Sequence, residues 1–452
     1  MVSKKNIRER IKKPTDLPYL NQVIFHAILG FAIFTIRPLS IIYTFGILIF
    51  FILKIIRNPN NPVIILQAAA YVMAAEVFLR MTGGLIFYET GKYAVILFML
   101  FGLYNHNFKR SANIYIVFLL LLIPGVLVTF FDINYETNFR KTILFNLSGP
   151  LCLFASALYC YQREVKLIQY LRLLDTMVLP IITMATYLFF YTPNLQDVVT
   201  GADANFAASG GFGPNQVSTV LGIGMFCLFV RLFLTYKSRM LRIIMYGVLA
   251  FFSFRALATL SRGGVFTAVI MSVFFMISFF RYATPTAKAK GAAKVVAIGV
   301  GAIAVWSLTL IATNNMLYNK YTDRNASGKK QGDITTGRID IAKTDFEAFE
   351  QNPVLGIGVG MGKFFRAKEE DIKAASHNEV TRLISEHGFL GILSLILLIT
   401  IPAVLYLTDN RNIFIIPFIL FWFLTINHSA MRIAAPGFIY GLALLKVKFD
   451  KS

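Results

Sequence analysis

Residues 112 to 131 read ANIYIVFLLLLIPGVLVTFF, a run without a single charged side chain. Such a run is long enough to cross the hydrocarbon core of a bilayer, which is roughly 30 Å thick. Comparable apolar runs recur along the whole chain. Because no water reaches backbone groups inside that core, we expect each run to form a helix that satisfies its own amides and carbonyls. The sequence therefore predicts an all-α fold, a polytopic transmembrane helical bundle of about 12–14 helices.

The composition of the 452-residue chain agrees with a membrane protein. Hydrophobic residues make up 56% of it and the mean hydropathy is +0.64, more than a soluble protein of this size needs. The net charge is +21, which in a soluble protein would first suggest nucleic acid. Here the basic residues lie mostly in short loops between apolar runs, where they set the topology. We therefore expect the lipid bilayer as a partner and no nucleic acid, with the excess positive charge suited to an anionic or pyrophosphate-bearing substrate.

Fourteen segments have the length and composition of membrane spans. They are 20–36, 39–56, 63–80, 88–104, 112–131, 144–161, 168–191, 215–236, 241–258, 264–281, 294–312, 388–407, 412–428 and 434–447. Lys and Arg gather at the N-terminus, in every second loop and in the tail, whereas 193–214 contains none. The positive-inside rule therefore predicts that both termini lie in the cytoplasm.

Two segments on the predicted outer side are long. One is 192–214, which is rich in Gly, Asn and Asp, and the other is 313–387. The second has 75 residues and is large enough to fold on its own. We therefore divide the chain into transmembrane helices 1–11 at 1–312, an outer loop domain at 313–387, and C-terminal transmembrane helices with a cytoplasmic tail at 388–452.

Inside the long outer segment, the spacing of apolar residues predicts an amphipathic helix. Ile339, Ala342, Phe346 and Phe349 fall on one helical face. We expect Thr335 or Thr336 to cap the start of this helix and Asn352-Pro353 to end it. A Gly-rich turn follows, and then a helix that runs from about Ser376 into the next span.

The strongest local signal is His377-Asn378-Glu379, at the head of that last helix. On a helix, Glu379, Arg382 and Glu386 share a face, which we expect to be a solvated charge ladder. His377 lies off that face and could point into a cleft. A neutral imidazole, whose pKa is near 6.5, suits a general base at neutral pH. The alternative is a surface histidine in a loop.

Two arginines are predicted on the same side of the membrane as His377. Arg262 stands in Ser261-Arg262-Gly263-Gly264 between two apolar runs, where a guanidinium is costly unless it is paired or functional. Arg338 follows Gly337 at the start of the amphipathic helix, where it could meet an anionic group from above. The plain alternatives are snorkelling for Arg262 and a surface ion pair for Arg338.

Other polar residues have plainer interpretations. Glu76 and Arg80 are an i, i+4 pair in the third span, where an ion pair is the simplest explanation, although they could also line a cavity. The glycines at 356, 358, 360 and 362 do not follow a parallel strand, so we expect a turn that packs onto the membrane surface rather than a dinucleotide site. The remaining histidines and the cysteines read as structural, and no spacing suggests a metal. These isolated residues are His26, His106, His428, Cys152, Cys160 and Cys227.

The residues around His377 resemble a known family. His377-Asn378, nine residues, Gly388, two residues and Gly391 match the pattern His-[Asn/Ser/Gln]-x9-Gly-x2-[Gly/Thr/Tyr] of O-antigen ligases. Gly337-Arg338 and the stretch 352–358 resemble the same superfamily, which also includes O-antigen and exopolysaccharide polymerases. The resemblance covers about 255–395. The N-terminal half is similar only in its helical character, and fourteen helices are two more than the usual twelve of the ligases.

The resemblance implies a GT-C-like bundle in the bacterial inner (cytoplasmic) membrane, with its active site at the periplasmic face. It implies inverting glycosyl transfer that is independent of metal and cofactor, from an undecaprenyl diphosphate-linked glycan to an acceptor hydroxyl. By this resemblance His377 takes the catalytic position, and Arg262 and Arg338 take those of two essential arginines. Asn378 and Arg80 are further candidates for substrate binding. The departing diphosphate accumulates negative charge, which bidentate arginines can neutralise.

Several functions are compatible with the sequence. A ligase would join the lipid-linked glycan to a lipid A-core acceptor, whereas a polymerase would join lipid-linked repeat units to a growing glycan. A flippase for the same lipids would share the helix number, but we would expect it to lack the 75-residue outer segment and to show two related halves. A purely structural membrane protein is the last alternative.

Overall fold

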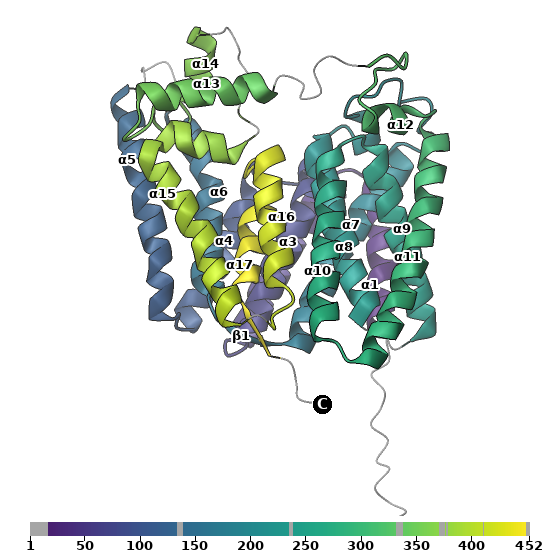
Figure 1. Ribbon diagram of the computed structural model, residues 1–452. Coiled ribbons are helices and arrows are strands. Elements are labelled where there is room, and N and C mark those ends of the chain that lie inside the picture. The colour runs from purple at the N-terminus through teal and green to yellow at the C-terminus, as the bar shows by residue number, and fades with distance from the viewer. Residues whose placement is uncertain are drawn as a thin grey trace, which may run out of the picture.

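Figure 1 shows a computed structural model of the chain, which describes residues 17–132, 139–234, 238–330, 338–369, 376, 378–409 and 411–448. These residues form seventeen α-helices and two three-residue strands. Eleven of the helices are long and apolar enough to cross a membrane. The predicted all-α, polytopic membrane bundle is confirmed.

The helices of the first two thirds of the chain run along the bundle. They are α1 (Leu17–Thr35), α2 (Leu39–Arg57), α3 (Pro62–Thr82), α4 (Thr90–Asn105), α5 (Ile114–Asp132), α6 (Phe139–Cys160), α7 (Leu167–Tyr191), α8 (Pro214–Leu234), α9 (Arg239–Ala258), α10 (Arg262–Tyr282) and α11 (Pro285–Ala312). The rest are α12 (Met316–Tyr321), α13 (Arg338–Gln351), α14 (Gly362–Glu369), α15 (Glu379–Thr408), α16 (Ile415–His428) and α17 (Ala435–Ala443). The strands are β1 (Glu164–Lys166) and β2 (Lys446–Lys448), and short 3₁₀ turns lie at Arg110–Asn113 and Ala207–Ser209.

Each of the fourteen predicted spans contains a helix, but three of these helices are short. They are α4 with 16 residues, α16 with 14 and α17 with 9. The predicted span 434–447 is wrong at its end, because residues 446–448 form a strand. β2 pairs in parallel with β1, so backbone groups there are satisfied by a neighbouring strand instead of a further helical turn.

Among the eleven membrane-length helices, α3 and α8 are the most buried: in each, 89% of the most apolar window is inside the bundle, against 11% for α11. α3 packs against α2, α4 and α7, and α8 against α7, α9 and α10. A run of alanines at 68–70 and 74–75 gives α3 the small surface that lets helices approach closely. On α11, by contrast, Val296, Val300 and Ile303 are exposed, which is the pattern of a surface that a bilayer covers.

The two ends of the bundle differ. α12, α13 and α14 lie at one end, which we call the loop end, and β1 lies at the other, the strand end (Figure 1). The predicted topology assigns the loop end to the outer side of the membrane and the strand end to the cytoplasm.

The amphipathic helix predicted in the outer segment is α13, which ends at Gln351, directly before Asn352-Pro353. Its predicted caps, Thr335 and Thr336, lie outside the described residues. The face that packs on the bundle carries Thr344, Asp345 and Ala348, all buried, whereas Ile339 and Phe346 of the predicted apolar face are about half exposed. The polar face is buried because Asp345 finds charged and hydroxyl partners on two other helices.

The helix predicted to begin near residue 376 is α15, and it bends at Gly388, whose φ is 60° and ψ −139°. The loop after α13 fills the bend: the Ile357 amide donates to the Ser385 carbonyl at 2.9 Å, and the Phe389 amide donates to the Pro353 carbonyl at 2.7 Å. Gly356, Gly358 and Gly360 have positive φ and lie against α15, α5 and α6, respectively. This Gly-rich run therefore packs inside the bundle, and the prediction that it packs onto the membrane surface is wrong.

Candidate functional site

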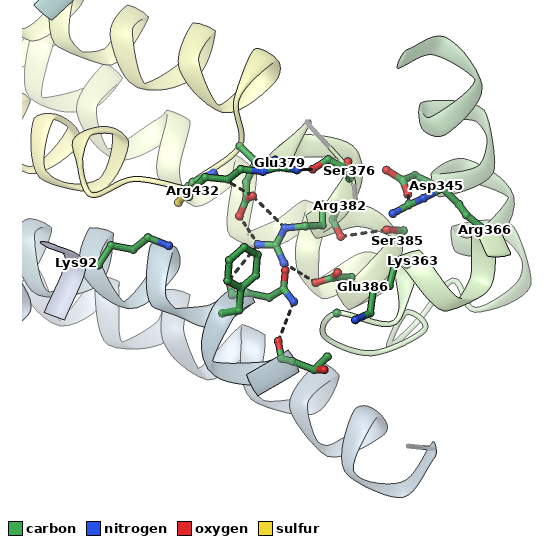
Figure 2. Close-up of a pocket in the computed structure, with 17 residues that line it drawn as sticks. Lys92, Asp345, Lys363, Arg366, Ser376, Glu379, Arg382, Ser385, Glu386 and Arg432 are labelled. Carbon is green, nitrogen blue, oxygen red and sulfur yellow. Dashed lines mark hydrogen bonds and ion pairs between the residues drawn. The ribbon is translucent and has the colours of Figure 1, made fainter. Parts of the chain in front are cut away.

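A cavity of about 410 Å³ lies at the loop end, between α4, α6, the start of α15 and the loop that precedes α17 (Figure 2). Charged side chains dominate its lining. The basic ones are Lys92, Lys363, Arg366, Arg382 and Arg432, and the acidic ones are Asp345, Glu379 and Glu386. Five basic against three acidic groups leave the described lining with two positive charges, which favours an anionic ligand.

Arg382 lies in the middle of this cavity, between two carboxylates (Figure 2). Its guanidinium forms ion pairs with Glu379 and, at 2.5 Å, with Glu386, and it donates to the Asn146 carbonyl of α6 at 3.4 Å. The predicted ladder is confirmed, but the predicted solvated face is wrong: the exposed fractions of Glu379, Arg382 and Glu386 are 2%, 8% and 2%. Burial is possible because the charges neutralise one another and find hydrogen-bond partners.

A second buried group joins three helices in the wall of the cavity. Asp345 of α13 pairs with Arg366 of α14, and its other oxygen accepts a hydrogen bond from the Thr381 hydroxyl of α15 at 2.7 Å. Burial raises the pKa of the Asp345 carboxyl, against the hydrogen bond from Thr381 and the charge of Arg366. This group fixes the outer helices α13 and α14 to the head of α15.

Two further cations reach the cavity from other parts of the chain. Lys92 pairs with Glu89 at 2.6 Å and donates to the Ser148 hydroxyl at 2.8 Å. Arg432 donates to the Ser376 carbonyl at 3.2 Å, and burial lowers the pKa of its guanidinium. The loop before α17 is thus bound directly to the residue that precedes His377.

His377 and the side chain of Arg338 lie outside the described residues, so their predicted roles stay predictions. The residues on either side of His377 are described. Ser376 lines the cavity, and Asn378 is the N-cap of α15, its side-chain oxygen accepting from the Val380 amide at 2.8 Å. The observed function of Asn378 is therefore to begin the helix, and substrate binding by it stays a prediction.

Arg262 is the first residue of α10, and it is paired rather than free. Its guanidinium contacts the Asp323 carboxylate at 2.7 Å, and its side chain is 27% exposed. It is not among the residues that line the cavity. Its neighbour Gly263 packs against His428 at the end of α16, three residues before Met431, which does line it. Arg262 thus begins a helix that packs beside the cavity wall.

The predicted ion pair between Glu76 and Arg80 is present at 2.5 Å in the interior of the bundle. Arg80 also donates to the Arg432 carbonyl at 2.9 Å and stacks on the Tyr88 ring, with 4.1 Å from its guanidinium carbon to the ring centre. It does not line the cavity but supports the loop that carries Arg432. Substrate binding by Arg80 stays a prediction.

Sequence reasoning missed five of the charged lining residues, namely Lys92, Asp345, Lys363, Arg366 and Arg432. A usable signal existed for Lys92 and Arg432, because each interrupts or borders an apolar run, and a charge at membrane depth is a functional hypothesis by default. No such signal existed for Asp345, Lys363 and Arg366. They lie in a polar loop, where charged residues are common and only the folded structure brings them together.

Residues 247–396 match a family model described as O-antigen ligase. A comparison with curated proteins found no match. The matched stretch begins in α9 and ends within α15, so it includes Arg262, Arg338 and the buried ladder of Arg382. It nearly coincides with the range over which the motif resemblance extends. The match confirms the predicted resemblance of this region to the O-antigen ligase and polymerase superfamily.

Proposed function

We propose that this membrane protein is a ligase that transfers a glycan from undecaprenyl diphosphate to an acceptor hydroxyl of lipid A-core at the periplasmic face of the inner membrane. The O-antigen ligase domain supports this class of reaction. The observation that carries the proposal is that Ser376 and Glu379, the nearest described lining residues on either side of His377 in the sequence, border a cavity with two excess positive charges. A cationic cavity suits a donor whose leaving group is a diphosphate.

In the proposed step, His377 takes the proton from the acceptor hydroxyl while the oxygen of that hydroxyl forms a bond to the anomeric carbon of the donor glycan. The bond from that carbon to the diphosphate oxygen breaks, and the lipid diphosphate leaves with the bonding electrons. Attack from the face opposite the leaving group inverts the configuration. By the family resemblance, Arg262 and Arg338 neutralise the charge that develops on the diphosphate, which removes the need for a metal. Arg262 does not line the cavity and pairs with Asp323, so in this proposal it reaches the diphosphate from beside the cavity and exchanges that partner for it.

The first experiment replaces the proposed base. His377→Ala should abolish transfer in a deletion strain complemented with the full chain, since a general base contributes roughly 10²–10⁴-fold to a rate. The amount of protein in the membrane should stay unchanged. His106→Ala is the matched control. This histidine follows the last turn of α4, whereas the cavity residue Lys92 lies in the first turn of that helix, so its replacement should not affect transfer.

The lipopolysaccharide pattern of the deletion strain distinguishes the candidate functions. Polymer that accumulates on the lipid carrier but is missing from the core supports the ligase. Single repeat units indicate the polymerase instead. Normal core-linked polymer from His377→Ala would show that the base is wrongly assigned and would favour the flippase.

The arginines are tested separately from the histidine. Arg262→Lys keeps the charge but loses the planar fork that binds a phosphate through two hydrogen bonds, so transfer should fall severely. Arg338→Lys should behave alike. Arg281→Lys, at the exposed far end of the same helix α10, should leave transfer unchanged. Wild-type rates from both Lys variants would contradict the proposed diphosphate contacts.

A further inference from the structure

A second and larger cavity, of about 950 Å³, lies towards the strand end of the bundle. Its walls come from α1, α2, α3, α7, α8 and α9. None of these helices supplies a residue that lines the first cavity. Its volume is at the upper end of the range of ligand pockets, about 300–1,000 Å³. It therefore has room for a ligand that the proposed glycan transfer does not use.

The cavity is continuous with the apolar surface of the bundle. Phe25 of α1 and Phe50 of α2 both line it, and both are more than half exposed, at 58% and 56%. In a membrane this surface faces acyl chains. A ligand can therefore enter sideways from the bilayer without crossing a polar barrier.

The deep polar groups of the cavity satisfy one another. The Tyr71 hydroxyl contacts His26 Nε2 at 2.6 Å and the Tyr43 hydroxyl at 2.8 Å, and His26 Nδ1 contacts the Gln22 carbonyl at 2.7 Å. An apolar chain can cover this network without leaving a buried polar group unpaired. The interior is thus compatible with an acyl chain.

The mouth of the cavity is cationic. Lys54 in the last turn of α2, Arg172 in the second turn of α7 and Arg231 near the end of α8 line it, against one carboxylate, Asp175. Arg231 pairs with Asp175 at 2.7 Å, whereas Lys54 and Arg172 form no ion pair with another described residue and Lys54 Nζ lies 5.6 Å from the centre of the Phe50 ring. Lys54 lies eleven residues from Tyr43, which is about 16 Å along a helix. This separation is close to the thickness of the hydrocarbon region of one leaflet, which is about half of a core of roughly 30 Å. The apolar interior therefore matches the acyl chains of one leaflet, and the cationic mouth matches its headgroups.

From this geometry we propose that the cavity binds one anionic phospholipid of the cytoplasmic leaflet. An acyl chain lies over the Tyr43–Tyr71–His26 network, and the phosphate lies between Lys54 and Arg172. Basic pockets between helices on the cytoplasmic side are a known mode of recognition for anionic headgroups. The inference uses the predicted topology but is independent of the proposed glycan transfer.

Gly46 offers a direct test, because it lines the cavity and a Cβ added there meets no atom within 4 Å. Gly46→Leu should place a four-carbon side chain in the part of the cavity where the acyl chain would lie, without a backbone clash. Gly247→Leu is the matched control: this residue is also an exposed helical glycine with open space, but it lies on α9 away from the cavity. After delipidation of the full chain in neutral detergent, native mass spectrometry should find one phosphatidylglycerol on wild type and Gly247→Leu and none on Gly46→Leu.

The headgroup contact is tested with charge variants. Lys54→Gln with Arg172→Gln should weaken the preference for phosphatidylglycerol over phosphatidylcholine about 25-fold, from roughly a five-fold contribution of each basic residue. Lys288→Gln with Lys290→Gln removes two exposed charges outside the cavity and should leave the preference unchanged. Equal retention of phosphatidylglycerol by wild type and Gly46→Leu would overturn the proposal. Retention of undecaprenyl diphosphate by the wild-type protein, instead of a phospholipid, would also overturn it.

Discussion

At the scale of single residues, the buried charges of the site depend on their partners. Arg382 is shared by two buried carboxylates, Glu379 and Glu386. Removing one member of such a group leaves the others uncompensated in a medium of low polarity, which typically costs about 3–5 kcal/mol. An ion pair on the surface contributes far less, because solvent screens it.

We therefore predict that Arg382→Met lowers the stability of the protein by about 3–5 kcal/mol. The measurement is thermal unfolding of the purified full chain in detergent. Lys343→Met is the control, since Lys343 on α13 is 68% exposed and its pair with Asp340 is open to solvent. It should change stability by no more than about 0.5 kcal/mol. An unchanged unfolding temperature for Arg382→Met would mean that the two carboxylates are not held by this arginine.

At the scale of elements, the bend of α15 shows how a loop can shape a helix. The Pro353 carbonyl accepts a hydrogen bond of 2.7 Å from the Phe389 amide. A regular helix through Gly388 would lose this hydrogen bond. Gly388 meets this demand because only glycine adopts its left-handed φ of 60° without strain. The bend turns the first helical turns of α15, which carry Arg382, towards α6 and α13.

Gly388→Ala should destabilise the protein more than Gly328→Ala, although both glycines have positive φ, 60° and 78°. A Cβ at Gly388 would lie 2.6 Å from the Pro353 carbonyl oxygen, whereas one at Gly328 meets nothing within 4 Å. Gly328→Ala therefore reports backbone strain alone, about 1–2 kcal/mol. Thermal unfolding of the two variants measures the difference, and equal losses would show that the loop does not pack into the bend.

At the scale of the whole molecule, the sequence predicts the helices better than their contacts. Apolar length alone located a helix in all fourteen predicted spans, and Asn352-Pro353 predicted where α13 ends. The buried face of Glu379, Arg382 and Glu386 could not be predicted, because spacing shows which residues share a face and not what covers it. The cavity likewise depends on α4, α6 and the loop before α17, which are distant in sequence. For His377 and Arg338, the site assignment stays a prediction.

The orientation of the whole bundle is the last prediction, and the lipid inference depends on it. A membrane-impermeant maleimide should label Lys330→Cys in intact cells and Lys448→Cys only after permeabilisation. Both lysines are exposed, at the loop end and the strand end respectively, and the native cysteines Cys152, Cys160 and Cys227 are buried, so they should add little background. Lys448 pairs with Glu164 only at the surface, so its replacement should not disturb the fold. The opposite labelling pattern would turn the cationic mouth of the larger cavity towards the periplasm, and the cytoplasmic-leaflet lipid would then have to be abandoned.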